Sequence, residues 1–188
     1  MSEIQDDLAG AIPVTAAAIA AVGEEQWSDP STCTDWNVRD LVEHLVGGVW
    51  LTASVLAGEG ATGRPDQSEM ADHALANAFT EAGGRVVATL AEPDVLQRPV
   101  RVGMGPVPGV VAAQLCLVET LVHGWDVARS TGADVTFDQG TVQRTLDFSK
   151  AMMSQIPEGR SPFAEERHPA AGASPLEQLI ALLGRESR

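Results

Sequence analysis

The chain has 188 residues, of which 44% are hydrophobic and 20% charged, a composition typical of one globular domain with a substantial core. Its formal net charge of −14, from 26 acidic and 12 basic residues, argues against nucleic-acid phosphates and anionic membrane surfaces as partners. Aromatic residues are only 4% of the chain, so we expect a core of small aliphatic side chains, which suits close helix packing.

The N-terminal residues 1–7 lack the basic segment of a signal peptide, and the apolar stretch 11–22 is too short to cross a bilayer. We therefore expect a cytoplasmic protein. Cys33 and Cys116 are the only two cysteines, which do not make a disulfide framework, and a single bridge between them is left as a minor alternative.

Apolar residues at helical spacing predict the first two helices. The first spans residues 4–22, and Pro13 marks a point where it is expected to kink or restart. The second spans residues 38–57, and Asn37 is placed to cap it through its side-chain oxygen.

Residues 61–68 are polar and contain Gly and Pro, which predicts a loop. A third helix is expected over residues 69–90, although the adjacent Gly83 and Gly84 weaken it. The segment that follows is dense in Pro and Gly, and its weak alternation is compatible with a short β-hairpin near residues 98–107.

The clearest helix is the fourth, over residues 108–130, with Pro at its start and Gly just past its end. A fifth is expected over residues 138–156 and a short closing helix over residues 176–183. There is no internal repeat and no interdomain linker. The prediction is an all-α fold forming a single domain over residues 1–188.

The fourth helix carries a pair of residues with metal-ligand chemistry. Glu119 and His123 are four positions apart, so both side chains point the same way and can clasp one cation. His44 lies in the second helix beside the apolar stripe, and two helices of a bundle can bring three such ligands to one internal point. Two imidazoles and one carboxylate leave an open coordination position, as in catalytic zinc or non-haem iron sites.

Spacing alone leaves a simpler interpretation open for each residue. A glutamate and a histidine four residues apart often form an ordinary surface ion pair, as Glu119 and His123 would. His44 can equally be a histidine at the edge of the core that is hydrogen-bonded to Asp40.

Two longer motifs extend these observations. The segment 32–46, TCTDWNVRDLVEHLV, resembles the second-helix motif of the DinB-like, mycothiol-dependent maleylpyruvate isomerase N-terminal domain family. The segment 119–132, ETLVHGWDVARSTG, resembles the second motif of that family. The segment 174–185, SPLEQLIALLGR, is similar to the tail of a single-domain actinobacterial subfamily, so the resemblance covers nearly the whole chain in matching order.

The resemblance implies a DinB-like four-helix bundle with extra C-terminal helices and a divalent metal held by His44, Glu119 and His123. Zinc is the first expectation, with nickel, iron and manganese as alternatives. The resemblance also implies mycothiol as a cofactor. The partners expected are therefore a small-molecule thiol and an electrophilic substrate, and both a monomer and a homodimer are left open.

The function implied is that of a metal-dependent S-transferase or isomerase that uses a low-molecular-weight thiol. The full isomerase has a separate C-terminal domain that this chain is too short to hold, so maleylpyruvate isomerisation itself is not extended to it. A metal-dependent hydrolase and a non-catalytic metal-binding protein are the alternatives, and whether the chain is catalytic is left open.

Four residues near the expected ligands have more than one interpretation. Asp126 can orient a ligand histidine or pair with Arg129. Cys116 can line the same cavity, but we expect it to be a small buried residue. Arg39 is expected to pair with a nearby Asp, and Trp36 is expected to pack a helix end rather than to stack on a substrate.

Overall fold

The computed structural model describes residues 2–60, 66–103, 105–156 and 164–186. These residues form six α-helices, two short 3₁₀ helices and one two-stranded sheet, so the predicted all-α class is confirmed. The chain divides into two compact units, Met1–Thr136 and Phe137–Arg188, and each is described by itself. The single domain over residues 1–188 stays a prediction.

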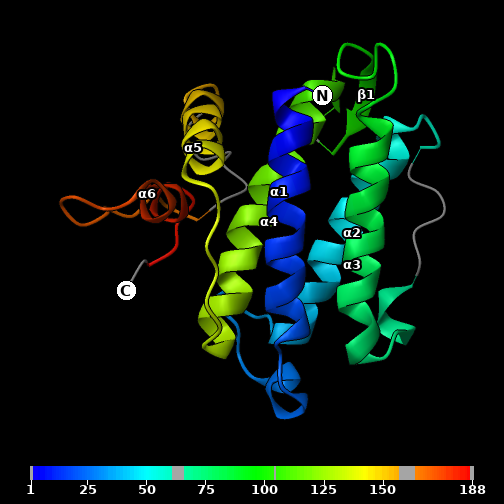
Figure 1. The fold of residues 1–188 in the computed structure, drawn as a ribbon. Helices are drawn as coiled ribbons and strands as arrows, with labels where there is room; N and C mark the ends of the chain where they lie inside the picture. The colour runs from blue at the N-terminus through cyan, green and yellow to red at the C-terminus, as the bar shows by residue number, and fades with distance from the viewer. Residues whose placement is uncertain (1, 61–65, 104, 157–163, 187–188) are drawn as a thin grey trace. The chain divides into compact units, whose positions relative to one another are not determined.

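The first unit is a bundle of four helices that lie side by side (Figure 1). They are α1 (Glu3–Ala20), α2 (Val38–Leu56), α3 (Asp72–Thr89) and α4 (Gly109–Thr131). Both α1 and α2 pack against α3 and α4, which places α1 and α2 on a diagonal of the bundle. The helices that carry the expected ligands, α2 and α4, are therefore direct neighbours.

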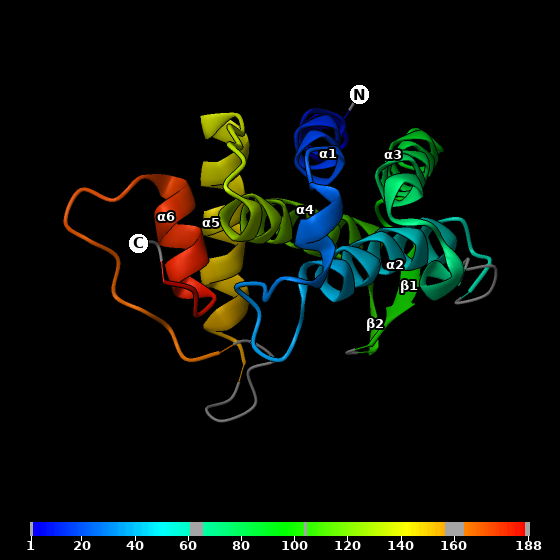
Figure 2. The same ribbon diagram turned by 90° about the horizontal axis from the view of Figure 1, so that it is seen from below.

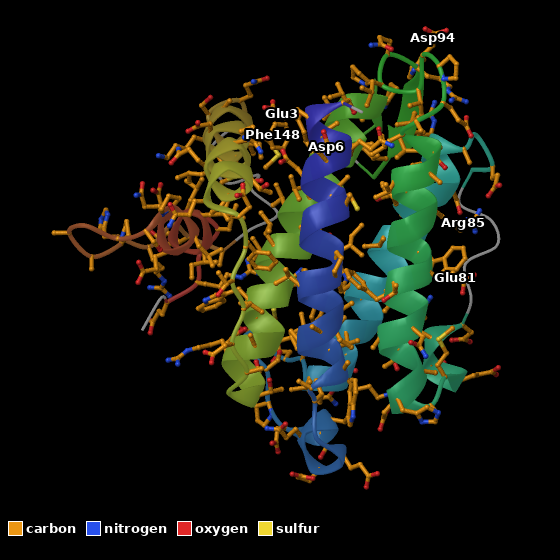
Figure 3. All side chains as sticks on the ribbon, in the orientation of Figure 1. Glu3, Asp6, Glu81, Arg85, Asp94 and Phe148 are labelled. Carbon is orange, nitrogen blue, oxygen red and sulfur yellow. The ribbon has the colours of Figure 1, made fainter. Side chains whose placement is uncertain are left out.

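The first helix is continuous through Pro13, so a restart of the helix there is wrong, while a kink at Pro13 stays a prediction. A proline inside a helix removes one backbone hydrogen bond and frees the carbonyl four residues earlier. Pro13 and Ala9 are both on the exposed side of α1, where water can satisfy that carbonyl. Glu3 and Asp6, labelled in Figure 3, lie in the first turn, where negative charge complements the helix dipole.

The third helix begins at Asp72, three residues later than predicted, because Gln67–Glu69 forms a separate 3₁₀ turn. The glycines do not interrupt it. A Cβ at Gly83 would lie 2.6 Å from Cγ2 of Ile12, so this glycine allows α1 and α3 to approach closely. The close packing offsets the helix propensity that glycine lacks.

The predicted hairpin near residues 98–107 is confirmed. Its strands, β1 (Pro99–Val102) and β2 (Gly105–Pro108), pair antiparallel and lie beside α2 (Figure 2). The second strand leads directly into α4. Residues 61–65 of the predicted loop 61–68 lie outside the described residues.

Gly109, at the start of α4, should tolerate no side chain. A Cβ at this position would lie 2.0 Å from the backbone oxygen of Val95, and backbone cannot move aside as a flexible side chain does. We expect Gly109→Ala to lower the free energy of unfolding by about 1–3 kcal/mol, measured by urea denaturation. Gly10→Ala in α1 is the control, because a Cβ there meets nothing within 4 Å. Equal stability of the two variants would contradict this prediction.

The second unit contains α5 (Gln139–Met153) and α6 (Pro175–Leu182), which pack on each other. They are the extra C-terminal helices that were predicted. The fifth helix ends three residues before the predicted end, and residues 157–163 lie outside the described part of the chain. Ser174 caps α6, since its hydroxyl accepts the backbone N–H of Glu177 at 3.3 Å.

One helix of the described residues, α4, is long and apolar enough to cross a membrane by length and composition. However, 67% of its most apolar stretch is buried inside the structure, as in the core helix of a bundle. It is therefore weak evidence for a membrane span.

Candidate metal centre

The start of α2 is fixed by the predicted cap. The side-chain oxygen of Asn37 accepts the backbone N–H of Asp40 at 2.8 Å, and the Asp40 carboxylate accepts the backbone N–H of Asn37 at 3.0 Å. Asp40 is thus engaged at the helix end and not with His44. One turn further on, His44 points toward α4.

His44, Glu119 and His123 come together between α2 and α4. Oε2 of Glu119 lies 3.4 Å from Nε2 of His44 and 3.0 Å from Nε2 of His123. The three donor atoms all lie within 4.8 Å of one another. Tetrahedral ligands with metal bonds of about 2.1 Å are about 3.4 Å apart. The donor set therefore fits one divalent ion, and its occupation by a metal stays a prediction.

The cluster is buried on one side and open on the other. The side chain of His123 is 8% exposed, whereas those of Glu119 and His44 are 37% and 45% exposed. A ligand can therefore approach from the α2 side without disturbing the core. Such an open side is the feature that distinguishes catalytic from structural metal sites.

Asp126 contacts the ring nitrogen of His123 that does not face Glu119, and so orients the ring. It is 0% exposed, and its Oδ2 lies 2.9 Å from Nδ1 of His123. Its Oδ1 accepts the Thr32 hydroxyl at 2.6 Å. A proton on Nδ1 leaves the lone pair of Nε2 directed at the cluster, the arrangement in which a second carboxylate fixes a metal-binding histidine. Of the two interpretations of Asp126, the structure supports the pairing with His123.

The loop before α2 contributes two residues that sequence reasoning did not assign. The Cys33 thiol lies 3.6 Å from Oδ2 of Asp126, and the backbone N–H of Thr32 is bonded to the Ser130 hydroxyl at 3.1 Å. Cys33, His123 and Asp126 also form a second group with metal-ligand atoms close together. The only sequence signal for this docking was the run of small polar residues just before the Asn37 cap.

Trp36 covers the two imidazoles. Its ring centroid lies 4.7 Å from that of His44 and 6.4 Å from that of His123. Trp36 is half-buried and does more than pack a helix end, because its ring also lies beside those of the two expected ligands, tilted by 45° and 42°. Arg39 pairs with Asp72 of α3, as predicted, and also with Glu43 at 2.7 Å.

Charges and hydrogen bonds shift the pKa values of His123 and Glu119 in opposite directions. Burial alone would lower the pKa of His123, but its bonds to Asp126, Cys33 and Glu119 raise it well above the usual value. Burial alone would raise the pKa of Glu119, but its bonds to His123 and His44 lower it well below the usual value. Without a metal, these contacts favour the protonated form of His123, which lies between two carboxylates.

Zinc binding should therefore compete with a proton. Because the pKa of His123 is raised, the ring holds its proton more strongly than a free imidazole does, and metal binding must displace that proton. We expect zinc affinity to fall as the pH falls, and protons to be released on binding. Calorimetric titration in two buffers of different ionisation enthalpy measures this release. An affinity that is the same at acidic and neutral pH would contradict it.

Cys116 is a buried residue, as predicted, and no disulfide joins it to Cys33. Burial raises the pKa of its thiol to about 12, although hydrogen bonds with Thr52 and Thr120 act in the opposite direction. It belongs to neither group of candidate ligands found among the described residues. His73 and His168 are exposed and also lie outside both groups.

Cys116 is therefore expected to be inert in the folded protein. At pH 8, four pH units below its pKa of about 12, only about 1 thiol in 10,000 is ionised. In a Cys33→Ser background, iodoacetamide should modify Cys116 only after denaturant is added, as followed by mass spectrometry. Rapid modification of the folded protein would show that the thiol is accessible and ionised.

Known proteins resemble this chain in sequence and in fold. The model of the mycothiol maleylpyruvate isomerase N-terminal domain family matches residues 8–128. Two uncharacterized proteins of Mycobacterium tuberculosis, MT0763 from strain CDC 1551 / Oshkosh and Rv0738 from strain ATCC 25618 / H37Rv, are each 31% identical over 182 residues. Each alignment covers 92% of this chain and 92% of the relative.

Two solved structures are similar in fold. A DinB-like protein from Bacillus subtilis has a TM-score of 0.58 at 19% identity, with 72% of this chain and 97% of that chain covered. A mycothiol-dependent maleylpyruvate isomerase has a TM-score of 0.60 at 18% identity, with 77% of this chain and 68% of that chain covered. Both likenesses show the DinB-like bundle that the sequence motifs implied.

Proposed function

Because the chain belongs to the mycothiol maleylpyruvate isomerase N-terminal domain family, we propose that it is a metal-dependent enzyme that uses a low-molecular-weight thiol. The reaction is an S-transfer or an isomerisation through a thiol adduct, and mycothiol is the thiol. The observation that carries this proposal is the meeting of His44, Glu119 and His123 around one point with an open side.

The donor set also suggests the metal. Two imidazoles and one carboxylate with an open position are typical of catalytic zinc, and we propose zinc. Iron, nickel and manganese accept the same ligands and are tested beside it. A divalent ion held there supplies positive charge, which lowers the pKa of a thiol that reaches the open side.

The residues of the chain have distinct tasks in this scheme. Glu119 and His123 would hold the ion from α4, while His44 would hold it from α2. Asp126 keeps the proton on Nδ1 of His123, and the Trp36 ring packs against the His44 ring. The nucleophilic sulfur in this scheme comes from the cofactor and not from Cys116, whose thiol is buried and has a raised pKa.

The same cluster is also compatible with a metal-dependent hydrolase or a non-catalytic metal-binding protein. A cytoplasmic location and a monomeric or homodimeric state complete the proposal.

Binding of a thiol to the metal-loaded protein tests the proposed thiol-dependent function. Purified protein is analysed for metals, stripped with chelator, reloaded with zinc and titrated with mycothiol by calorimetry. S-methyl mycothiol is the matched control, since it has the same sugar and cysteine parts but no free thiol. We expect mycothiol to bind at least tenfold more tightly than the control and only to the reloaded protein. If mycothiol and S-methyl mycothiol bind equally, or if neither binds, the thiol-dependent function is contradicted. Ester hydrolysis by the same sample would support the hydrolase.

A further inference from the structure

The loop before α2 brings a thiol to the side of the His123 ring that does not face Glu119. The backbone N–H of Cys33 donates to the Ser31 hydroxyl at 3.1 Å, which fixes the loop at this residue. The Cys33 thiol lies 3.6 Å from Oδ2 of Asp126, and the same oxygen lies 2.9 Å from Nδ1 of His123. One carboxylate oxygen therefore contacts a thiol and an imidazole nitrogen at once.

Hydrogen bonding alone is a weak reason for a cysteine at this position. A thiol is a weak hydrogen-bond donor, and a serine hydroxyl would bond to the carboxylate more strongly. Sulfur is instead a strong ligand of soft metal ions. One donor atom from each of Cys33, His123 and Asp126 lies within 4.8 Å of the other two, so sulfur, nitrogen and oxygen ligands come together here.

The distances in this group are close to those around a bound divalent ion. Metal bonds of about 2.3 Å to sulfur and about 2.1 Å to oxygen, at a tetrahedral angle, place these two atoms about 3.6 Å apart. Sγ of Cys33 and Oδ2 of Asp126 are 3.6 Å apart. Nδ1 of His123 is closer to Oδ2, at 2.9 Å, and has to separate to about 3.4 Å when a metal replaces the shared proton. Oδ1 of Asp126 stays bonded to the Thr32 hydroxyl at 2.6 Å, so the carboxylate keeps its orientation.

Cys33 gives the group access to solvent. It is half-buried, whereas His123 and Asp126 are 6% and 0% exposed. An ion can therefore reach the thiol from solution while the other two ligands stay in the core, and water can supply a fourth ligand.

His123 cannot serve both groups of ligands at once. A neutral imidazole offers a metal one lone pair, on the nitrogen that carries no proton. An ion on Nε2 joins His44 and Glu119, and Asp126 then accepts the proton on Nδ1. An ion on Nδ1 joins Cys33 and Asp126, the thiol proton passes to water, and the ring proton lies on Nε2, where Glu119 accepts it at 3.0 Å. The two carboxylates thus exchange roles.

We propose that Cys33, His123 and Asp126 form a second metal site, which takes soft, thiophilic divalent ions and excludes an ion from the first group. The thiolate favours a soft ion such as cadmium more than two imidazoles and a carboxylate do. Binding of that ion withdraws His123, so it empties the first group without contacting His44 or Glu119. The inference goes beyond the proposed function and does not depend on it, because it concerns only which ions bind and where.

Cadmium is the probe for the second site, because a thiolate bound to cadmium absorbs in the ultraviolet. Metal-free, reduced protein is titrated with cadmium chloride. We expect this absorption in the unsubstituted chain, in Cys116→Ser and in His44→Ala, and its loss in Cys33→Ser. Cys116→Ser is the matched control, since it removes the other cysteine of the chain, and His44→Ala removes a ligand of the first group only.

Displacement of zinc tests the exclusion. Zinc-loaded protein is dialysed against cadmium, and the ions on each chain are counted by native mass spectrometry. We expect cadmium to replace zinc one for one, and Cys33→Ser to need at least tenfold more cadmium for the same loss of zinc. A chain that holds both ions at once would overturn the exclusion.

Absorption of unchanged strength in Cys33→Ser, or none in the unsubstituted chain, would overturn the second site. If Cys33→Ser does not fold, cadmium NMR of the Cys116→Ser chain decides, because sulfur ligation moves the resonance to frequencies that nitrogen and oxygen ligands alone do not reach. A resonance typical of nitrogen and oxygen ligands in that chain would contradict the proposal. Binding of mycothiol to the zinc-loaded protein is a separate result, which bears on the proposed function alone.

Discussion

Replacing His44 with Ala is expected to weaken zinc binding by more than about 100-fold and to leave the bundle folded. Loss of a residue that only orients a ligand already costs about 10–100-fold in metal affinity, and His44 is an expected ligand itself. Its side chain is 45% exposed, so its removal loses little buried surface. Glu119 and His123 would remain in contact at 3.0 Å, because that pair lies within α4.

A matched control separates the ligand role from a general effect of losing a histidine. His73→Ala removes an exposed histidine from α3, outside the cluster. Zinc affinity is measured by competition with a chromophoric chelator, and the fold by circular dichroism and melting temperature without metal. Similar affinities for the two variants would show that His44 is not a ligand, and Glu119 and His123 would then be an ordinary ion pair.

The helices and their order were predictable from the sequence because helical periodicity is a local signal. The common direction of Glu119 and His123 follows from their spacing within one helix. Spacing could not show that His44 faces them, since that depends on how α2 is rotated against α4. The family resemblance supplied this information. The continuity of α1 through Pro13 was missed for a similar reason, because it depends on which side of the helix meets water.

Two features of the first unit needed the tertiary structure. Thr32 and Asp126 are 94 residues apart in sequence, and no periodicity connects them. Gly48 and Gly83 are both glycines inside amphipathic helices, yet one adjoins open space and the other a close helix contact. The residues alone do not distinguish these cases, because the difference lies in the neighbouring helix.

Replacing Asp126 with Asn is expected to reduce zinc affinity by about 10–100-fold, although the change is nearly isosteric. The carboxylate accepts hydrogen bonds from His123, Thr32 and Cys33. An amide has one oxygen for these donors, and its NH₂ group must face one of them. If the NH₂ faces His123, Nδ1 becomes an acceptor without a proton, and the remaining ring proton lies on Nε2, the atom that a metal would bind. If it faces Thr32, the hydroxyl contact that docks the loop is lost.

Asp134→Asn is the matched control, since it makes the same charge change at an exposed residue of the same unit. Zinc affinity is measured by chelator competition, and NMR of the histidine rings reports which nitrogen of His123 carries the proton. We expect the metal-free His123 ring of Asp126→Asn to lose its proton on Nδ1 and to keep one on Nε2, and the zinc affinity to fall, with Asp134→Asn unchanged in both. If the variant loses stability but keeps its zinc affinity and its ring protonation, Asp126 only anchors the loop. In that case His123 is oriented by the packing of α4, where its side chain is 8% exposed, and not by the carboxylate behind it.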